Sequence, residues 1–380
     1  MAGLELLRQG AVGASGLPLA SLPSELTSAL VGYDALVFAG WDLCASNLAV
    51  AARSHAVLDP TQLAAVERAL EPLTPWPALG DEAFCRNVAG SHRLAAKSRR
   101  DAIHLLRADL RRFRETASLD ALVVVNLAST ERHVDPATPA FASLAALERA
   151  LDEDDASIGP AVLYAYAALS ESVPYANFTP NVCVEVPALR ELAAERKVPV
   201  AGKDGKTGQT FLKTVLAPAL RARALRVEGW FSTNLLGNRD GLALDDPASR
   251  AAKIETKGTV LDQMLGYSVP DHVVDIQYYR PRGDNKEAWD NIDVVGFLDQ
   301  RMQVKVNFLC RDSILAAPLV IELARLLDLA ARRGASGAQE QLSVFFKRPM
   351  GTEPDRTPEH AFAEQQRRLL EWLASDSPHR

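Results

Sequence analysis

The alternation of short apolar runs with longer helical stretches in the first 210 residues most constrains the fold of this chain. Apolar runs at 34–40 (DALVFAG), 122–126 (LVVVN) and 198–202 (VPVAG) have the length of buried strands. Helical spacing of apolar residues occurs in 92–118 and 188–197. Strands that alternate with helices favour an α/β fold with a doubly wound parallel sheet. Such sheets bind ligands outside the carboxyl ends of their strands.

The pattern changes after about residue 210. The runs VEGWF, VVDIQYY, DVVGFL and MQVKVNF are expected to be strands separated by turns, which predicts a second, α+β domain with an antiparallel or mixed sheet. One strong helix is expected over 312–333, with Asp312 or Ser313 at its N-cap. A last amphipathic helix is expected over 358–374.

Composition narrows the class of protein. The chain is 48% hydrophobic and 24% charged, with a net charge of −6 and no long basic run, which argues against nucleic acid as the main partner. No window approaches 18 uninterrupted apolar residues, so we expect no membrane span. The four cysteines are far apart, which suits reduced thiols better than a disulfide framework or a zinc site. We therefore expect a cytoplasmic protein without a metal site.

Lysine is scarce and unevenly placed. Eight of the ten lysines lie between residues 203 and 347, and Lys253 and Lys257 are one helical turn apart in AAKIETK. Such a pair is usually solvated surface, but an anionic ligand would rationalise two neighbouring like charges. The pKa of lysine also falls readily on desolvation, so lysine can transfer protons where arginine cannot.

The loop GKDGKTGQT (202–210) leads from a predicted strand into a predicted helix. Free backbone N–H groups at a helix start form a natural seat for phosphate. The GKT within it is no Walker A motif, because the first glycine of that motif would fall at Val200. From this stretch alone, a phosphate seat and a plain strand–helix turn are equally favoured.

Taken together, these segments resemble the myo-inositol-phosphate synthase family. The similar segments are FAGWD (38–42), ASTER (128–132), KDGKTGQT (203–210), STNLLGNRDG (232–241), KIETK (253–257), RPRGDNK (280–286), LCRDSILAAPL (309–319) and FFKRP (345–349). The likeness runs from about residue 34 to the C-terminus with the motifs in one order, and that ordered set is highly specific.

The resemblance implies a Rossmann-like NAD-binding domain (1–210), an α+β catalytic and oligomerisation domain (211–315), and a C-terminal segment (316–380) that returns to the first domain. It implies NAD-dependent isomerisation of D-glucose 6-phosphate to 1D-myo-inositol 3-phosphate, by oxidation, enolisation, intramolecular aldol closure and reduction, in a homotetramer.

The resemblance also implies the site residues, by position in the family's motifs. The catalytic set is Lys253, Lys257, Lys286, Lys347, Asp204 and Asp312. The substrate phosphate set is Thr207, Gly208, Gln209, Thr210, Asn234 and Asn238. The cofactor set is Asp42, Ala128, Ser129, Thr130, Thr179, Asp240 and Ser313.

The chain departs from the family pattern in a few places. The family's first strand and glycine-rich turn have no counterpart before residue 34, and we expect the natural start to lie upstream of Met1. Lys203, Phe178 and Arg239 stand where the family has an acid, a glycine and an asparagine. Two alternatives therefore stay open: a catalytically silent sugar-phosphate- or NAD-binding relative that serves as a scaffold, and a different NAD-dependent sugar-phosphate enzyme.

Overall fold

The structure is a computed structural model that describes residues 1–86, 88–238, 241–242, 260–353 and 358–375. Its helices are α1 (Ala2–Arg8), α2 (Ser24–Thr27), α3 (Leu48–His55), α4 (Pro60–Leu70), α5 (Arg99–Thr116), α6 (Leu144–Asp152), α7 (Pro160–Ser170), α8 (Pro187–Glu195), α9 (Gln209–Ala222), α12 (Asp312–Arg332) and α13 (Phe362–Ala374). Short 3₁₀ helices are η1 (Tyr33–Ala35), η2 (Pro139–Phe141), η3 (Arg280–Arg282), η4 (Phe297–Asp299) and η5 (Glu340–Phe345). The strands are β1 (Trp41–Asp42), β2 (Trp76–Pro77), β3 (Val124–Asn126), β4 (Tyr175–Asn177), β5 (Pro199–Gly202), β6 (Arg226–Leu236), β7 (Asp271–Tyr278), β8 (Asn285–Val295), β9 (Arg301–Arg311) and β10 (Gly337–Ala338).

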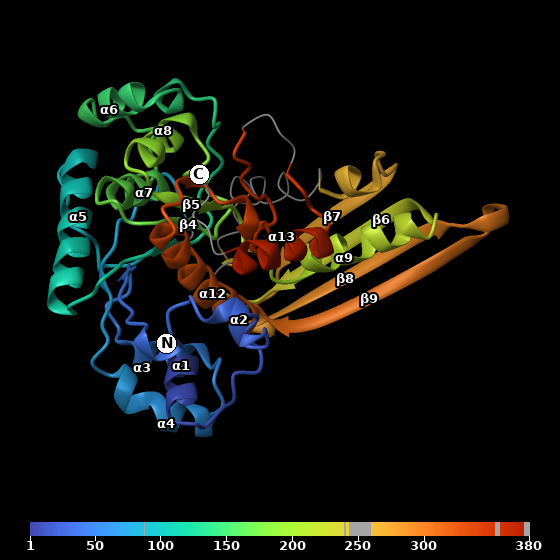
Figure 1. The fold of residues 1–380 in the computed structure, drawn as a ribbon, viewed down its shortest axis with the longest axis horizontal. Helices are drawn as coiled ribbons and strands as arrows, with labels where there is room; N and C mark the ends of the chain where they lie inside the picture. The colour runs from blue at the N-terminus through green and yellow to red at the C-terminus, as the bar shows by residue number, and fades with distance from the viewer. Residues whose placement is uncertain (87, 239–240, 243–259, 354–357, 376–380) are drawn as a thin grey trace.

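A four-stranded parallel sheet, ordered β10-β5-β4-β3, forms the centre of the first half. Alternate strand residues face opposite sides, as the pleat requires. Tyr175 and Val200 pack into a core with α5, α6, α7 and α8, whereas Ala176 and Ala201 pack into a second core with α12, η5 and α13. The predicted α/β fold with helices on both faces of a parallel sheet is therefore confirmed (Figure 1).

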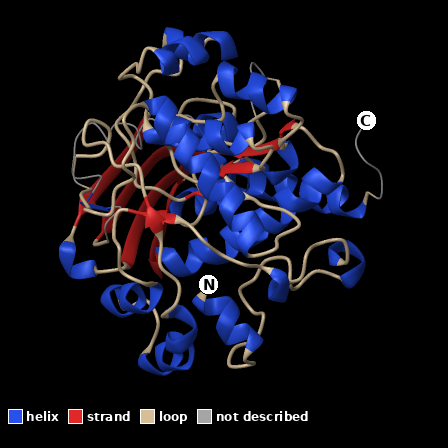
Figure 2. Cartoon of the chain, turned by 90° about the vertical axis from the view of Figure 1, so that its left-hand side faces the viewer, coloured by secondary structure: helices blue, strands red, loops and turns tan. Residues whose placement is uncertain are grey.

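A second, mixed sheet, ordered β7-β6-β8-β9, projects away from the parallel sheet (Figure 1). β6 pairs with β7 in parallel and with β8 in antiparallel orientation. One face is covered by α9 and by helical residues 260–265, whose apolar side chains pack around the buried Trp230. Figure 2 views the molecule from the side of α5–α8.

The predicted mixed sheet is confirmed, but turns alone do not connect its strands. A parallel pair needs a crossover, and the helical residues 260–265 lie between β6 and β7. α9 belongs to the core of the second sheet and β10 joins the parallel sheet. These positions support boundaries near 210 and 315, which we keep as a proposal together with the return of 316–380 to the first domain.

The strand predicted over 34–40 is wrong. Residues 33–35 form η1, Val37 is 54% exposed, and the strand begins only at Trp41. Its partner is Trp76–Pro77, in a separate two-stranded sheet. Because proline has no N–H to donate, this ladder ends after two residues.

The segment before the parallel sheet has a small core of its own. Leu6, Ala49, Val66 and Leu70 pack together between α1, α3 and α4, which lie beside one another in Figure 1. Asp59 and Gln62 form a reciprocal capping box that starts α4. Further along, Tyr33 donates to the buried carboxylate of Glu322 at 2.6 Å, which attaches this segment to α12.

Candidate functional site at the junction of the two sheets

The loop 203–208 between β5 and α9 is held from both sides by backbone hydrogen bonds. On one side, the N–H groups of Asp204 and Gly205 donate to the carbonyls of Thr179 and Phe178. On the other side, the loop exchanges hydrogen bonds with residues 345–348, including Lys347 N–H to the Asp204 carbonyl at 2.6 Å. Two segments that are about 140 residues apart in the chain therefore meet at one place.

A buried ion pair results from that meeting. Lys347 donates from Nζ to Asp204 Oδ1 at 2.7 Å, and both side chains are less than a tenth exposed. Burial of a charge is costly, and this pairing offsets part of that cost for both groups. The structure therefore brings together two residues of the predicted catalytic set, Lys347 and Asp204.

A second lysine lies above the start of α9. Lys286, the second residue of β8, is 3.5 Å from Asp312 Oδ1, and the Thr207 hydroxyl donates to the same oxygen at 2.9 Å. A Cβ added at Gly208 would lie 4.0 Å from Lys286 Nζ. The ammonium group and the N-terminal end of α9 thus converge on one spot, which favours an anion there.

The predicted N-cap of α12 is wrong. Arg311 occupies that position without a side-chain capping bond, although Asp312 and Ser313 follow it directly. Asp312 turns instead toward Thr207 and Lys286, and Ser313 donates to Asp284 Oδ2 at 2.6 Å. An ammonium and a hydroxyl from other elements are stronger partners for Asp312 than its own helix start.

Two amide side chains of the predicted phosphate set, Gln209 on α9 and Asn234 on β6, form a separate group between α9 and the second sheet. Asn234 Nδ2 donates to Gln209 Oε1 at 2.6 Å. Gln209 Nε2 in turn donates to Asp290 Oδ2 at 3.1 Å. Thr210 is buried in the first turn of α9, while Asn238 accepts from the N–H of Gly241 at 3.0 Å.

The carboxyl ends of β3 and β4 carry most of the predicted cofactor residues. Asn126 and Asn177 are hydrogen-bonded to each other and shape the loop from Leu127 to Thr130. Thr179 is buried and donates to Asn177 Oδ1 at 2.7 Å, so it supports this loop. Leu127 is 60% exposed and Ala128 is exposed, which leaves an apolar surface at this edge. These features fit the ring and the polar groups of a dinucleotide.

Asp42 lies in the small β1–β2 sheet, exposed, and accepts from the N–H of Cys44 at 2.8 Å. Lys253, Lys257 and Asp240 fall outside the described residues. Among the residues that are described, no group of three His, Cys, Asp or Glu side chains could hold a metal ion. In the same part of the chain, no helix is long and apolar enough to cross a membrane.

Several buried polar residues near the site were not predicted. Burial lowers the pKa of Lys206 to about 7, and its ammonium donates to Gln365 on α13. Burial also lowers the pKa of Lys213, to about 8, although Asp290 opposes the shift. Both residues belong to the cluster of lysines between 203 and 347, which was the available signal.

Lys203 has a clear role in the structure. It donates to Glu185 across the carboxyl end of β5, and Glu185 also accepts from the N–H of Cys183 at 3.0 Å. The family pattern has an acid at position 203, and the positive charge of Lys203 is paired with Glu185 in this chain. Phe178, the second departure, packs edge-on against Phe346 and covers Gly205.

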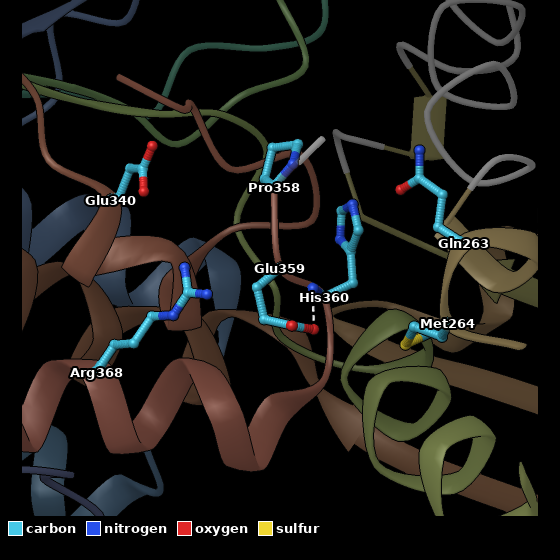
Figure 3. A pocket seen from close by; sticks show the side chains of 7 residues that line it. All are labelled: Gln263, Met264, Glu340, Pro358, Glu359, His360 and Arg368. Atoms are coloured by element: carbon cyan, nitrogen blue, oxygen red, sulfur yellow. Dashed lines mark hydrogen bonds between the residues drawn. The ribbon is translucent and has the colours of Figure 1, made fainter. Parts of the chain in front are cut away.

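A cavity of about 300 Å³ lies beside this region, between α13, η5 and residues 263–264. The lining side chains are those of Gln263, Met264, Glu340, Pro358, Glu359, His360 and Arg368 (Figure 3). Glu359 accepts from the N–H of His360 at 2.8 Å, and burial lowers the pKa of His360 to about 4. None of the predicted site residues that the structure describes lines this cavity, so we place the site at the ion pairs instead.

The fold and the site define a doubly wound α/β protein with two lysine–carboxylate pairs beside the start of α9, where its two sheets meet. The family model described as myo-inositol-1-phosphate synthase matches residues 21–374. The chain belongs to this family, as the sequence motifs predicted.

Curated relatives agree with this assignment. The chain is 43% identical over 352 residues to inositol-3-phosphate synthase 1 of Bacteroides thetaiotaomicron, which covers 90% of this chain and 82% of the relative. It is 33% identical over 313 residues to a probable inositol 3-phosphate synthase isozyme 3 of Arabidopsis thaliana. That match covers 80% of this chain and 61% of the plant protein.

Solved structures agree as well. Inositol-3-phosphate synthase of Caenorhabditis elegans superposes with a TM-score of 0.86 at 27% identity, covering 92% of this chain and 73% of the other. A myo-inositol-1-phosphate synthase-related protein from Thermotoga maritima gives a TM-score of 0.79 at 25% identity, covering 100% of this chain and 95% of the other.

Proposed function

We propose that this chain is an inositol-3-phosphate synthase, which converts D-glucose 6-phosphate to 1D-myo-inositol 3-phosphate with bound NAD. The observation that carries the proposal is the convergence of Lys286–Asp312 and Lys347–Asp204 beside the start of α9. Family membership and relatives named inositol-3-phosphate synthase support the same activity.

The substrate phosphate rests on the start of α9, beside Thr207, Gly208 and Thr210. Backbone N–H groups and the positive end of the helix stabilise its negative charge there. Lys257 is the additional partner of the phosphate, by its position in the family's lysine motif. This placement fixes one end of the substrate and leaves its carbon chain to reach the lysines.

Lysines carry the proton transfers in the proposed mechanism. Lys253 and Lys347 move the proton of the oxygen that is oxidised and later reduced, and Asp204 holds Lys347 in place. Lys286 polarises the aldehyde oxygen during ring closure, and Asp312 orients Lys286. Bound NAD supplies a reversible hydride acceptor at C5 of the sugar. Asp42, Ala128, Ser129, Thr130, Thr179, Asp240 and Ser313 are the proposed cofactor residues.

The assay is incubation of the chain with glucose 6-phosphate and NAD, followed by detection of inositol phosphate. Lys286→Met and Lys347→Met should each lower kcat by at least about a hundredfold, because each removes a charge or a proton donor from the reacting oxygens. Far-UV circular dichroism should show an unchanged fold. Tight binding of glucose 6-phosphate without product would identify the silent relative instead.

We also propose that four copies of the chain assemble through the uncovered face of the β7-β6-β8-β9 sheet. That face carries exposed apolar side chains, including Phe231, Val273, Trp289 and Leu309. An apolar patch of this kind on a sheet marks a protein interface. The four cysteines are free thiols, which supports a reducing compartment such as the cytoplasm.

A further inference from the structure

A buried carboxylate on the second sheet lies at the end of a chain of hydrogen bonds that leads to the candidate site. Asp290, on β8, is 4% exposed. Its Oδ1 accepts from Trp230 Nε1 and from the Ser232 hydroxyl, each at 2.7 Å. Its Oδ2 accepts from Gln209 Nε2 at 3.1 Å. Gln209 follows Gly208 directly, so this carboxylate is one side chain away from the proposed phosphate seat.

The carboxylate of Asp290 determines which group donates and which accepts in the hydrogen bond between the Gln209 and Asn234 amides. A carboxylate can only accept, so Gln209 must turn its NH₂ group toward Asp290. The Gln209 carbonyl oxygen therefore faces Asn234 and accepts from Asn234 Nδ2 at 2.6 Å. Consequently the carbonyl oxygen of Asn234 is directed away from Gln209 and remains available as an acceptor.

The carbonyl oxygen of Asn234 is an unsatisfied acceptor within the described part of the chain. Asn234 is 1% exposed, and its Oδ1 has no hydrogen-bond partner among the described residues. An unsatisfied buried acceptor is costly, so a donor is expected to complete it when ligand is bound. A phosphate monoester is mostly a dianion at pH 7 and offers acceptors rather than donors. A sugar hydroxyl offers the missing donor.

We propose that Asp290 is a positioning residue that fixes the Gln209–Asn234 amides so that Asn234 accepts a hydrogen bond from a hydroxyl of a polyol phosphate substrate. This inference rests on the proposed function and deepens it, because it assigns Asn234 to the carbon chain of the substrate. The sequence motifs alone had placed Asn234 with the phosphate.

Asp290→Asn should reverse the donor and acceptor in each hydrogen bond between these amides while keeping the hydrogen bonds themselves. The oxygen of the introduced amide retains the bonds from Trp230 and Ser232, while its NH₂ group takes the place of the carboxylate oxygen that accepts from Gln209. Gln209 must then turn its carbonyl oxygen to that NH₂, and Asn234 must turn its own carbonyl oxygen to Gln209. The group that Asn234 presents to the ligand changes from an acceptor to a donor.

The experiment measures dissociation constants by titration calorimetry for glucose 6-phosphate and for a set of analogues with one hydroxyl replaced by fluorine. Fluorine cannot donate a hydrogen bond. In the wild type, one analogue should bind about tenfold more weakly than glucose 6-phosphate, as expected for one lost hydrogen bond. In Asp290→Asn that penalty should fall to about twofold or less.

Ser232→Ala is the matched control, because it removes a donor to the same carboxylate and leaves the polarity of the amides unchanged. It should retain the wild-type fluorine penalty. Asn234→Ala should abolish the penalty, and Asp290→Asn added to it should change nothing further; the Asn234 variant carries the test if Asp290→Asn does not fold.

The inference is overturned if no analogue shows a penalty in the wild type, or if the penalty is unchanged in the Asp290→Asn or Asn234→Ala proteins. Failure of the proposed function has a different signature, which is absence of inositol phosphate from the wild-type reaction. A wild type that forms product and shows no fluorine penalty refutes the role of Asp290 alone.

Discussion

At the scale of single residues, Lys206 shows how the candidate site is attached to the C-terminal helix. It is 4% exposed, donates to Gln365 on α13, and its ammonium lies 5.6 Å from the centre of the Phe362 ring. Among the described residues, no carboxylate forms an ion pair with it. Desolvation without a counter-charge therefore lowers its pKa to about 7, from an ordinary value of 10.5.

This shift predicts a pH-dependent stability. Between pH 7 and 10.5 the unfolded chain binds a proton at Lys206 that the folded chain does not, so stability rises with pH over this window and is lowest below pH 7, where the buried ammonium is charged. Lys206→Met should reduce that slope by about 1 kcal/mol per pH unit. Urea unfolding at pH 7.5, 8.5 and 9.5 measures it. Exposed Lys97→Met, outside both sheets, should keep the wild-type slope, and an unchanged slope in Lys206→Met would refute the prediction.

Gly205 is required by its aromatic neighbour. A Cβ at this position would lie 2.1 Å from the ring of Phe178. This overlap is too severe to be relieved by a side-chain shift of a tenth of an ångström. Gly205→Ala should lower stability by about 1–3 kcal/mol through overpacking and should lower kcat by displacing Asp204. Thermal unfolding and the inositol phosphate assay measure both effects.

A second substitution, at Phe178, tests whether its ring causes the loss of activity in Gly205→Ala. Phe178→Ala combined with Gly205→Ala makes room for the added methyl group and should recover part of the lost kcat. Gly3→Ala, where an added Cβ meets no atom within 4 Å, should behave as the wild type. A double variant no more active than Gly205→Ala would show that the contact with Phe178 is not the cause.

At the scale of secondary-structure elements, the start of α7 depends on a buried acid from the loop after β3. Glu131 Oε1 accepts from the N–H of Ala161 at 2.9 Å, where Gly159 provides no side-chain cap. Burial raises the pKa of Glu131 to about 7 from 4.5. The folded chain then holds a proton between pH 4.5 and 7 that the unfolded chain releases, so stability is lost as pH rises through this window.

Glu131→Gln should remove that loss, because the amide keeps an acceptor for Ala161 and does not titrate. Relative to the wild type, the variant should gain about 1 kcal/mol per pH unit between pH 5 and 7. Guanidinium unfolding across this range provides the measurement, with the exposed Glu153→Gln as control. Parallel wild-type and Glu131→Gln curves would contradict the role assigned to burial.

The sequence predicted the elements whose signal is local. The run at 198–202, the glycine loop and the helix after it are present as β5, the loop 203–208 and α9, because each is specified by its own residues. The strand over 34–40 failed because an apolar run becomes a strand only with a partner, and the ladder with residues 76–77 includes Trp41 and Asp42 but not the run before them. Likewise, Asp312 could not be placed without knowing that Lys286 and Thr207 approach it.

Asp290 was not predicted from the sequence as a functional residue, although the residue pattern of β8 contains a signal for it. On β8 the inward positions carry Lys286, Ala288, Asp290 and Ile292, so two charged residues lie on a buried face. Alternation of polar and apolar residues alone treats such charges as exceptions. Charged residues at the inward positions of β8 were therefore the signal that Lys286 and Asp290 have a special role. The role of Asp290 could not be predicted from β8 alone, because its partners Gln209 and Trp230 belong to other elements.

At the scale of the whole molecule, the second sheet is covered on one face and open on the other. Trp230, Ser232 and Asn234 of β6 face α9 and are buried, whereas Phe231 points to the opposite face and is 47% exposed. It lies directly between Val273 of β7 and Asn291 of β8 in the register. A solitary chain would leave Phe231 and Val273, together with Trp289 and Leu309 on the same face, exposed to water, and this exposure supports the proposed interface between copies.

Phe231→Glu tests the assembly, because a charge at the centre of an apolar interface would be desolvated without a partner. The wild type should elute as a tetramer in size-exclusion chromatography with light scattering, and the variant as monomers or dimers at the same concentration. Phe231 points away from α9 and from the buried core, so circular dichroism should show an intact fold. Val37→Glu, the same kind of exchange at an exposed apolar residue outside this sheet, should leave the tetramer unchanged. A monomeric wild type, or a tetrameric Phe231→Glu protein, would exclude this face as the interface.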